Sequence, residues 1–438
     1  MSVAMPRQQV RLQIRSKITC PHCWHRFPTA RVEWIAAHPD LFGDPQLGPE
    51  AMLRFLPTRF THSGNALDSA GVECKEIACP NCHLRLPRAA AEQKPCFISI
   101  AGSPSSGKSF LLAAMAWQAR HVLPKLFNVE FADADAEFNR TITNYENQLF
   151  YAGDPDQFVT LSKTQETGDH YNTVRFGQMA VTLPQPFVFS ALPTRDHPRF
   201  EQAHRGARLV CWYDNAGESF QPGKDTANNA VTQHLGAAHA WMFCYDLTQN
   251  PHVREKIAAT RTNSSRQNVV TYRQEPMFFD MLTRIRKHAN LTGQSRTNRP
   301  LIVVCTKFDA WSGLTPDLKL TSPYQKATKQ LHVLNHGLIK NASAKTRELL
   351  SEFAPDLVTS AEAFSENVYY LPVSATGSES SVNEETGQSG FRCRDLKPVW
   401  CELPMLLALA FKSSRLVGVA NGSSLSDAIR NPNPAEDQ

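Results

Sequence analysis

Eight consecutive residues have the types and spacing of a loop that binds phosphate. They fit the pattern G-x-x-x-x-G-K-[ST], between an apolar run at 96–101 and a helical stretch at 110–122, and are Gly102, Ser103, Pro104, Ser105, Ser106, Gly107, Lys108 and Ser109. The glycines let backbone N–H groups point inward at phosphate oxygens, and the following helix adds its positive N-terminal end. We expect Lys108 to reach the β- and γ-phosphates and Ser109 to ligate Mg²⁺. The alternative is a Ser/Gly turn that only starts a helix.

An acidic motif follows a second apolar run. Residues 208–213 predict a buried strand, and Asp214 stands at its end, three residues before Gly217. An acidic residue at the end of a strand beside a phosphate loop is placed to hold Mg²⁺, usually through water. We expect the backbone N–H of Gly217 to contact the γ-phosphate. A D-x-x-G tetrapeptide alone is weak evidence for a nucleotide site. This one is stronger evidence because it follows a predicted strand and lies downstream of the phosphate loop.

Two further motifs favour guanine as the base of the nucleotide. They follow apolar runs at 301–305 and 368–373, and consist of Thr306, Lys307 and Asp309 in the first and Ser374 with Ala375 in the second. Guanine presents N1–H and its 2-amino group as adjacent donors, so the Asp309 carboxylate can accept both, whereas adenine has no N1–H. We expect Lys307 to lie along the base and brace the phosphate loop, and a backbone N–H of 374–375 to contact guanine O6. An ATP-dependent enzyme stays an alternative only if residues 306–309 are accidental.

The N-terminal part of the chain contains the pattern C-P-x-C twice. Cys20 and Cys23 form the first copy, and Cys79 and Cys82 form the second. Each turn places two thiolates on one metal ion, so two turns complete a tetrahedral Zn²⁺ site. The 55 residues between the copies predict an insertion at 29–73. The alternative is two unrelated turns with reduced cysteines, and substitute ligands ranked below the four cysteines are Cys74, His22, His25 and His83.

The composition is that of an ordinary globular protein with room for two or three domains. The chain has 438 residues, 42% hydrophobic and 20% charged, and a net charge of +5. Lysine and arginine are scattered along the sequence rather than clustered. The sequence therefore does not indicate a nucleic-acid partner, although it does not exclude one. No charged segment followed by an apolar stretch opens the chain, and the longest apolar segment is too short to span a bilayer. We therefore expect a cytoplasmic protein, whose 11 cysteines are metal ligands or core residues.

In this order, the motifs resemble those of the Ras-like, translation-factor-related (TRAFAC-class) P-loop GTPases. The resemblance covers residues 96–411, with long inserts. It implies an α/β domain with a doubly wound, mostly parallel sheet that binds GTP or GDP with Mg²⁺. A split C-P-x-C ribbon in front of such a domain is similar to the bacterial double-GTPase proteins of conflict and defence operons. That likeness implies a role in bacterial immunity and a protein partner, which would be a second GTPase, an effector or a second copy.

The resemblance also implies a catalytic set, which consists of Lys108, Gly217, Glu218 and Thr164. Glu218 stands where Ras-like proteins often have the glutamine that orients the attacking water. A carboxylate could orient or deprotonate water but repels the γ-phosphate, so we expect hydrolysis to be slow or to depend on a supplied arginine. The candidates for that arginine that we expect near the phosphate loop are Arg195, Arg199 and Arg205, and the sequence does not distinguish among them. As the switch threonine we choose Thr164 over Thr160 and Thr167.

The expected organisation is a zinc-ribbon-like domain at 1–95 with the insertion at 29–73, a GTPase domain at 96–411 and a flexible tail at 412–438. The stretch 376–394, rich in Ser, Gly and Glu, is predicted to be a flexible loop. The expected function is a GTP-binding switch with Mg²⁺-dependent GTPase activity. A protein partner is expected to recognise the surfaces that GTP orders. The alternative is a zinc-ribbon adaptor or scaffold that binds GTP structurally with little or no turnover.

Overall fold

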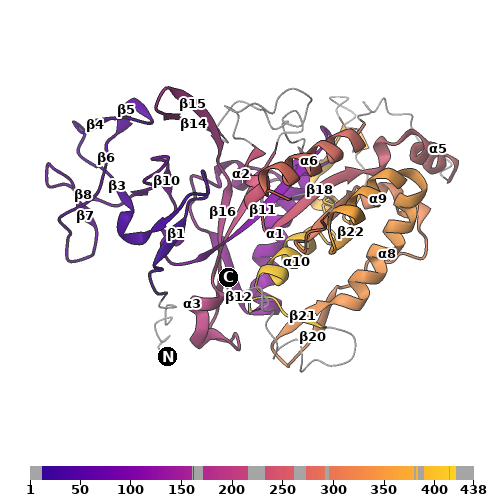
Figure 1. Cartoon of the computed structure of the whole chain (residues 1–438). Helices are drawn as coiled ribbons and strands as arrows, with labels where there is room; N and C mark the ends of the chain where they lie inside the picture. The colour runs from indigo at the N-terminus through magenta and orange to yellow at the C-terminus, as the bar shows by residue number, and fades with distance from the viewer. Residues whose placement is uncertain are drawn as a thin grey trace.

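The fold is organised around a sheet whose strands come from widely separated parts of the chain. The structure, a computed structural model, describes residues 12–159, 161, 171–215, 232–260, 273–291, 295–378, 381–382, 389–413 and 415–420. Within them, seven strands form one sheet in the order β12-β16-β17-β11-β18-β19-β22 (Figure 1). Their bounds are β11 Lys94–Gly102, β12 Val129–Asp133, β16 Phe187–Pro193, β17 Arg208–Asp214, β18 Ala240–Asp246, β19 Leu301–Thr306 and β22 Val368–Pro372.

This sheet is mostly parallel, as expected from the sequence. β17, β11, β18, β19 and β22 run in one direction, whereas β16 is antiparallel to both β12 and β17. The parallel strands are continuous apolar runs because both of their faces are covered. In β19, for example, every residue is buried. The carboxyl ends of the five parallel strands, at 102, 214, 246, 306 and 372, therefore meet at one edge of the sheet.

Helices cover the sheet on two sides, each with its own apolar core. α1 and α10 pack in the core that contains Trp212, and α6 and α9 pack in the core that contains Trp241. Among the described residues, no helix is both long enough and apolar enough to cross a bilayer. The helices are α1 Lys108–Val122, α2 Arg140–Phe150, α3 Ala203–Gly206, α4 His234–Ala237, α5 Pro251–Thr260, α6 Glu275–His288, α7 Phe308–Trp311, α8 His336–Phe353, α9 Pro355–Phe364 and α10 Leu403–Lys412.

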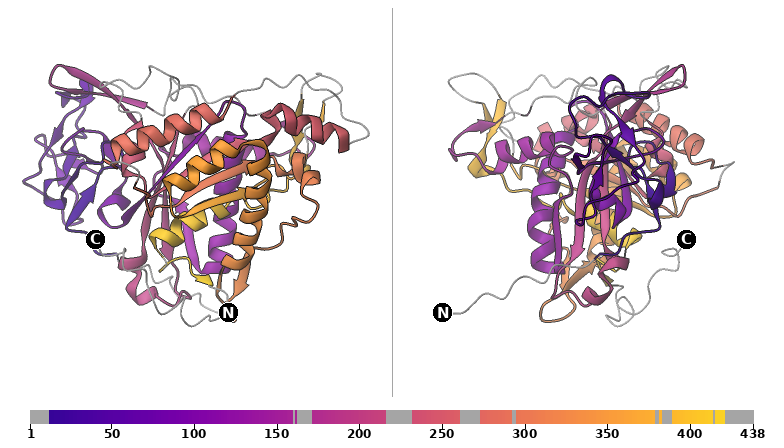
Figure 2. Two further views of the ribbon diagram at one scale, coloured as in Figure 1. Left: turned by 45° about the vertical axis from the view of Figure 1, so that its right-hand side comes forward. Right: turned by 90° about the vertical axis from the view of Figure 1, so that its left-hand side faces the viewer.

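The N-terminal part of the chain folds into short strands that pack against the sheet. β3, which lies within 29–73, pairs with β9, the strand that leads into Cys79. Ile18 and Trp34 share a core with Val188 of β16 and Leu209 of β17, and the views in Figures 1 and 2 show this indigo module against that side of the sheet. The strands are β1 Lys17–Thr19, β2 Arg26–Pro28, β3 Glu33–Ile35, β4 Phe42–Asp44, β5 Gly48–Met52, β6 Arg54–Phe55, β7 Ala66–Leu67, β8 Glu73–Cys74, β9 Ile77–Ala78 and β10 Arg85–Leu86.

Two segments expected to be flexible are folded in part. Within 376–394, β24 pairs with both β13 and β23. Beyond residue 412, Leu416 and Val417 are buried and β25 pairs with β21. β13 and β21 lie far from these segments in the chain, so the local composition does not reveal the pairing. The remaining strands are β13 Phe158–Val159, β14 Tyr171–Phe176, β15 Met179–Pro184, β20 Tyr324–Lys326, β21 His332–Asn335, β23 Ser381–Val382, β24 Ser389–Arg392 and β25 Val419–Ala420.

Candidate functional site

The phosphate-loop residues join the end of β11 to the start of α1. A Cβ atom on Gly102 would lie 2.8 Å from the Cβ atom of Cys244, so glycine is required where the loop leaves the sheet. Ser105 and Gly107 have φ values of 62° and 82°, in the left-handed region that lets the loop reverse. The Ser106 hydroxyl is buried and has no hydrogen-bond partner among the described residues. A buried hydroxyl without a partner fits an oxygen-rich ligand such as phosphate.

Lys108 and Asp214 form a buried ion pair at this edge of the sheet. β17 lies beside β11 with Asp214 opposite Ile100, and Lys108 is the first residue of α1. The Lys108 ammonium contacts the Asp214 carboxylate, and only 9% and 5% of the two side chains are exposed. Asp214 and Ser109, the next residue of α1, carry oxygen atoms of the kind that Mg²⁺ takes as ligands. The donor set therefore fits a magnesium ion together with a phosphate chain.

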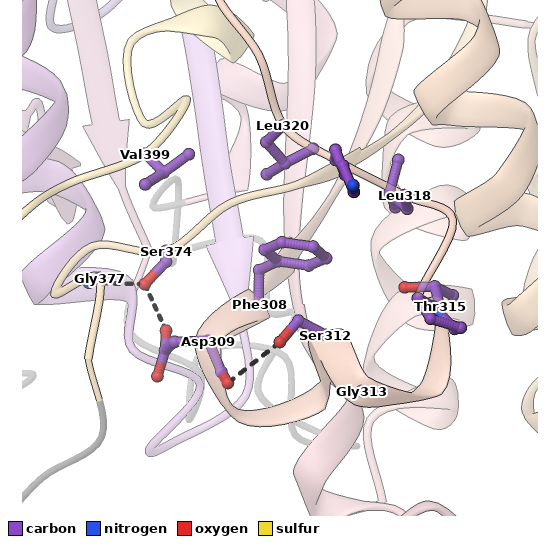
Figure 3. A pocket seen from close by; sticks show the side chains of 12 residues that line it. Phe308, Asp309, Ser312, Gly313, Thr315, Leu318, Leu320, Ser374, Gly377 and Val399 are labelled. Carbon is purple, nitrogen blue, oxygen red and sulfur yellow. Dashed lines mark hydrogen bonds between the residues drawn. The ribbon is translucent and has the colours of Figure 1, made fainter.

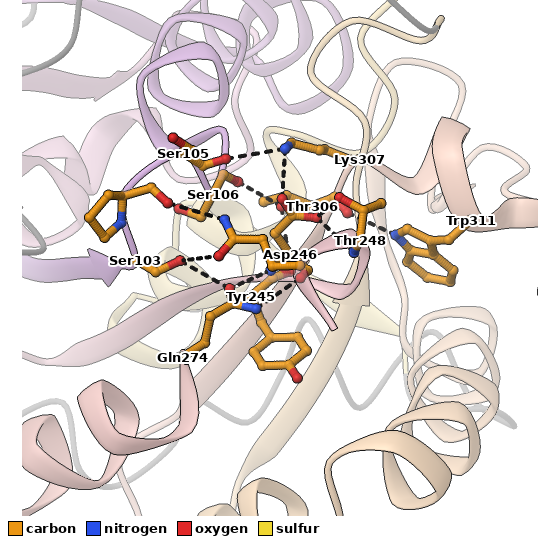
Figure 4. Close-up of polar contacts among 12 residues, drawn as sticks. Ser103, Ser105, Ser106, Tyr245, Asp246, Thr248, Gln274, Thr306, Lys307 and Trp311 are labelled. Atoms are coloured by element: carbon orange, nitrogen blue, oxygen red, sulfur yellow. Dashed lines mark hydrogen bonds and ion pairs between the residues drawn. The ribbon is translucent and has the colours of Figure 1, made fainter. Parts of the chain in front are cut away.

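Side chains from the end of β19 hold the phosphate loop in place (Figure 4). Thr306 Oγ1 donates a hydrogen bond to the Ser106 carbonyl oxygen at 2.7 Å. Lys307 Nζ donates to the Ser105 carbonyl oxygen at 3.1 Å and to the Asp246 carboxylate at 2.6 Å. The backbone of the loop is thereby tied to two strands besides its own. Lys307 thus lies against the loop that it was expected to brace.

Two buried glutamines that no sequence motif indicated complete this support. Ser103 Oγ donates to Gln274 Oε1 at 3.1 Å and to Gln249 Oε1 at 3.4 Å. Gln249 Nε2 donates to the Pro104 carbonyl oxygen at 3.1 Å, and Gln274 Nε2 donates to the carbonyl oxygen of Asp246 at 2.8 Å. Each glutamine stands alone in a polar stretch, so neither spacing nor residue type singled it out.

The residues expected at the base come together from two loops. Ser374 Oγ donates to the Asp309 carboxylate, and the backbone N–H of Gly377 donates to Ser374 Oγ at 2.8 Å (Figure 3). Gly377 has a φ of 72°, and a Cβ atom there would lie 2.1 Å from the Lys397 carbonyl oxygen, so this turn requires glycine. Ala375 follows Ser374 and is half-buried. The Asp309 carboxylate is therefore held in a fixed orientation.

A cavity of about 480 Å³ adjoins Asp309 and Ser374. Its remaining walls are largely apolar and include Phe308, Leu318 and Val399 (Figure 3). Apolar walls beside one carboxylate suit a flat ring that presents N–H donors. No motif in the sequence pointed to the wall formed by residues 312–320.

The two C-P-x-C turns meet in space and form one cluster of sulfur atoms. The ligand atoms of Cys20, Cys23, Cys79 and Cys82 all lie within 4.8 Å of one another. The Cys20–Cys82 and Cys23–Cys79 Sγ separations are both 3.7 Å. Tetrahedral geometry with Zn–S bonds of about 2.3 Å gives S···S separations of about 3.8 Å, so the cluster fits zinc. Pairing of β3 with β9 closes the long gap between the two turns.

The substitute ligands are directed elsewhere. The ring nitrogens of His22 lie 3.3 Å and 3.0 Å from the carbonyl oxygens of Pro184 and Arg85. His83 Nδ1 lies 2.7 Å from the Asp44 carboxylate. Cys74 Sγ lies 3.9 Å from the carboxylate of Asp68, and the His25 ring stacks on Phe27. Within the described chain, the metal-compatible cluster consists of the four paired cysteines.

A buried histidine contacts the strand end that carries Asp214. His234 Nε2 lies 2.8 Å from Asn215 Oδ1, and the His234 ring stacks on Tyr213 with centroids 4.7 Å apart. Burial lowers the pKa of His234 to about 3, so the imidazole is neutral at ordinary pH. A neutral ring donates from Nε2 to the Asn215 oxygen, which leaves Nδ1 without a partner among the described residues.

His234 is expected to make folding stability depend on pH. Its folded-state pKa lies below the unfolded value of about 6.5, so the unfolded state binds the proton more readily. Stability is therefore lost as the pH falls from about 6.5 towards 3. Between pH 7.5 and 5, wild type should lose about 2 kcal/mol relative to His234→Gln in denaturant titrations. His252→Gln, at a side chain 80% exposed, is the control, and a difference that does not change with pH would contradict the prediction.

Three of the predicted catalytic residues, Thr164, Gly217 and Glu218, lie outside the described residues. The alternative threonines, Thr160 and Thr167, also lie outside them. The structural description of the phosphate end of the site therefore rests on residues 102–109, on Asp214 and on the side chains that support the loop.

The arginines expected near the phosphate loop lie at the opposite edge of the sheet. β16 runs antiparallel to β17, and Ala191 near its end pairs with Arg208 at the start of β17. Arg195 and Arg199 follow the end of β16, and Arg205 precedes β17. A strand of this length separates its two ends by about 20 Å. The expectation that one of these arginines lies near this chain's own phosphate loop is therefore wrong, because closeness in sequence does not reveal strand direction.

Comparison with known proteins gives only distant likenesses. No protein-family model and no curated protein matches the chain. Solved structures that match include a single-residue variant of Aquifex aeolicus Era bound to GDP·AlF4⁻, with 13% identity, a TM-score of 0.26 and coverage of 73% of this chain and 57% of that one. Sup35 complexed with GDP has 12% identity, a TM-score of 0.22 and coverage of 66% and 39%. The GTPase-like domain of S. cerevisiae Ski7 bound to GTP has 12% identity, a TM-score of 0.24 and coverage of 64% and 43%.

This chain therefore spans 39–57% of the length of those three solved structures. At such TM-scores the likenesses carry no information about what this chain binds.

Proposed function

We propose that this chain binds GTP with Mg²⁺ and hydrolyses it to GDP and phosphate. The observation that carries the proposal is the convergence of three groups at the carboxyl edge of one parallel sheet. These groups are the phosphate loop between β11 and α1, the Lys108–Asp214 pair, and the Asp309–Ser374 pair. Ligands of open α/β sheets bind at this edge, where loops leave the strands.

In this proposal Lys108 exchanges one partner for another. Nucleotide binding would draw its ammonium from the Asp214 carboxylate to the β- and γ-phosphates, and Asp214 and Ser109 would then be available to hold Mg²⁺. The metal ion, when bound, neutralises negative charge on the phosphate oxygens. The loop backbone presents its N–H groups to the phosphates, and its position is set by Thr306, Lys307 and the two glutamines. Gly217 would contact the γ-phosphate.

The base would lie with its N1–H and 2-amino group directed at Asp309, and O6 at the backbone N–H groups of 374–375. Ser374 already donates to Asp309, which fixes the carboxylate before the base arrives. Preorganisation of this kind reduces the free energy spent on ordering at binding. GTP is favoured over ATP because adenine has no N1–H to donate to the carboxylate, which would then have no donor from the base.

Turnover is proposed to be slow, with Glu218 orienting the attacking water and Thr164 as the switch threonine. Since Arg195, Arg199 and Arg205 lie at the far edge of the sheet, we propose that a partner supplies the arginine. Within the proposal the chain is a cytoplasmic switch that acts with a protein partner in bacterial defence. The ribbon occupies 1–95 and the GTPase domain 96–411, and the partner and the defence role rest on the family resemblance alone.

The first experiment compares GTP with ATP. Titration of the zinc-loaded 438-residue chain with fluorescent GTP and ATP analogues, with and without Mg²⁺, should show binding of GTP that Mg²⁺ strengthens. Equal affinities for the two nucleotides would refute the guanine assignment. Multiple-turnover release of phosphate then separates a GTPase from the alternative, an adaptor in which GTP is structural. Phosphate release at the rate of the no-enzyme background would favour the adaptor.

Asp309→Asn is expected to exchange guanine specificity for xanthine specificity. Xanthine has a C2 carbonyl where guanine has an amino group, so the asparagine amide can donate to that oxygen while its own oxygen accepts N1–H. The loss of a charged acceptor for two donors amounts to about 3 kcal/mol, or about 100-fold weaker GTP binding. Competition between GTP and XTP measures the exchange. Asp356→Asn replaces an exposed aspartate on α9, away from the cavity, and serves as the control.

A further inference from the structure

Tyr213 joins the strand end of the magnesium site to the cysteine cluster. It is the residue before Asp214 and is only 1% exposed. Its hydroxyl donates to the Pro21 carbonyl oxygen at 2.6 Å and accepts from Trp24 Nε1 at 3.1 Å. Pro21 and Trp24 belong to the C-P-x-C turn that carries Cys20 and Cys23. One tyrosine oxygen therefore contacts both sides of that turn.

The turn itself determines where these two partners lie. Trp24 has a φ of 56°, and its backbone N–H donates to the Cys20 carbonyl oxygen at 3.1 Å. The backbone N–H of Cys20 in turn donates to the His25 carbonyl oxygen at 3.0 Å. A left-handed conformation is unfavourable for a tryptophan and persists where surrounding contacts impose it. A metal ion on Cys20 and Cys23 would hold the turn in this conformation.

The other side of Tyr213 is connected to the residues around Asp214. The Tyr213 and His234 rings are stacked with an interplanar angle of 4°, and His234 bonds to Asn215 at 2.8 Å. The backbone N–H of Asn215 donates to the Ile100 carbonyl oxygen at 3.1 Å, which seats the strand end against β11. Asp214 lies between Tyr213 and Asn215, so both of its neighbours in the chain are fixed by this arrangement.

We propose that Tyr213 is a positioning residue that couples metal binding at the four cysteines to Mg²⁺·GTP binding at Asp214. The proposal rests on the proposed function, because it concerns regulation of the same site. Zinc holds the turn, the turn holds the Tyr213 hydroxyl, and Tyr213 with His234 sets the position of Asp214. Linkage requires the effect to be reciprocal, so GTP must tighten zinc binding by the factor with which zinc tightens GTP binding.

The test measures this factor in wild type and in Tyr213→Phe, which removes one oxygen atom and keeps the ring. Dissociation constants for a fluorescent GTP analogue are measured in zinc-loaded and chelator-treated protein, each with and without Mg²⁺. In wild type, zinc removal should weaken Mg²⁺·GTP binding about 5- to 150-fold. Zinc-loaded Tyr213→Phe should bind Mg²⁺·GTP more weakly than zinc-loaded wild type does. Removal of zinc from this variant should weaken its Mg²⁺·GTP binding only slightly further. Because Asp214 acts through the metal ion, the Mg²⁺-free affinities should change much less.

Tyr370→Phe is the matched control, since it removes the hydroxyl of another buried strand tyrosine, which donates to the Val358 carbonyl oxygen. It should keep the wild-type zinc dependence. A residue with a merely structural role would lower the melting temperature without changing the ratio of the affinities with and without zinc. Zinc affinity, measured by competition with a chromophoric chelator with and without GTP, should show the same factor.

Identical Mg²⁺·GTP affinities of zinc-loaded and zinc-free wild type would overturn the proposal. If circular dichroism shows that the zinc-free protein unfolds, zinc-loaded Tyr213→Phe is compared with zinc-loaded wild type instead. Equal Mg²⁺·GTP affinities of these two proteins would then overturn the proposal. Absence of GTP binding by wild type in every state has a different meaning. That result would refute the proposed function itself, so GTP binding by wild type is measured before any variant is compared.

Discussion

Lys108→Ala is expected to weaken Mg²⁺·GTP binding by at least about 100-fold. The ammonium would donate charge-assisted hydrogen bonds to two phosphates, each with a net contribution of about 1.5–3 kcal/mol, and the variant loses both. Isothermal titration with a GTP analogue that resists hydrolysis measures the loss directly. Affinity within a few-fold of wild type would show that the loop at 102–109 does not hold the phosphates.

The same substitution has a second effect that must be separated from the first. Lys108 and Asp214 are a nearly buried pair, and removal of one partner from such a pair costs about 3–5 kcal/mol because the other charge is left alone. Lys108→Ala should therefore also lower stability. Adding Asp214→Asn removes the unpaired charge, so the double variant should regain stability in denaturant titrations. It should still fail to bind GTP, which a simple folding defect could not explain.

The local parts of the site could be predicted from the sequence. The loop at 102–109 is one turn of backbone between one strand and one helix, so its requirements appear as a contiguous pattern with glycine at two positions. Asp214, Asp309 and Ser374 each stand at the end of an apolar strand or within three residues of it. Because the carboxyl ends of parallel strands meet at one edge, a mostly parallel sheet is enough to bring them to the same side.

The supporting contacts could not be predicted, because each joins residues far apart in the chain. Gln274 reaches Ser103 across 171 positions, and Tyr213 reaches Pro21 across 192. A lone glutamine or tyrosine has no period or spacing that distinguishes it from a core residue. Strand direction is hidden in the same way, which is why Arg195 and its neighbours were expected near the loop and lie at the opposite edge.

The cysteine cluster shows both behaviours. Each C-P-x-C turn is a local pattern, and its two thiolates were recognised without the fold. The sequence also predicted that the two turns share one site, which the cluster confirms. The pairing of β3 with β9, a contact between the insertion and the segment before Cys79, could not be predicted in this way. Composition was least informative where polar segments pair with remote strands, as β24 does with β13.

Replacing Cys79 and Cys82 together by serine is expected to remove zinc from the protein and to destabilise the N-terminal module. Wild type should contain about one zinc per chain by elemental analysis, and the double variant close to none, because serine does not supply a thiolate. Structural zinc in small domains contributes about 10 kcal/mol or more to folding. The module shares a core with Val188 and Leu209 of the sheet. Unfolding of the module should therefore also destabilise the sheet.

The size of that effect can be checked by thermal unfolding. Even about 5 kcal/mol of lost stability corresponds to a melting temperature about 10 °C lower or more in a domain of this size. Cys393→Ser is the matched control, because Cys393 is partly exposed and lies outside the cluster. It should keep both the zinc content and the melting temperature. Wild type without zinc, or a double variant that retains it, would show that the four sulfur atoms meet for a reason other than zinc binding.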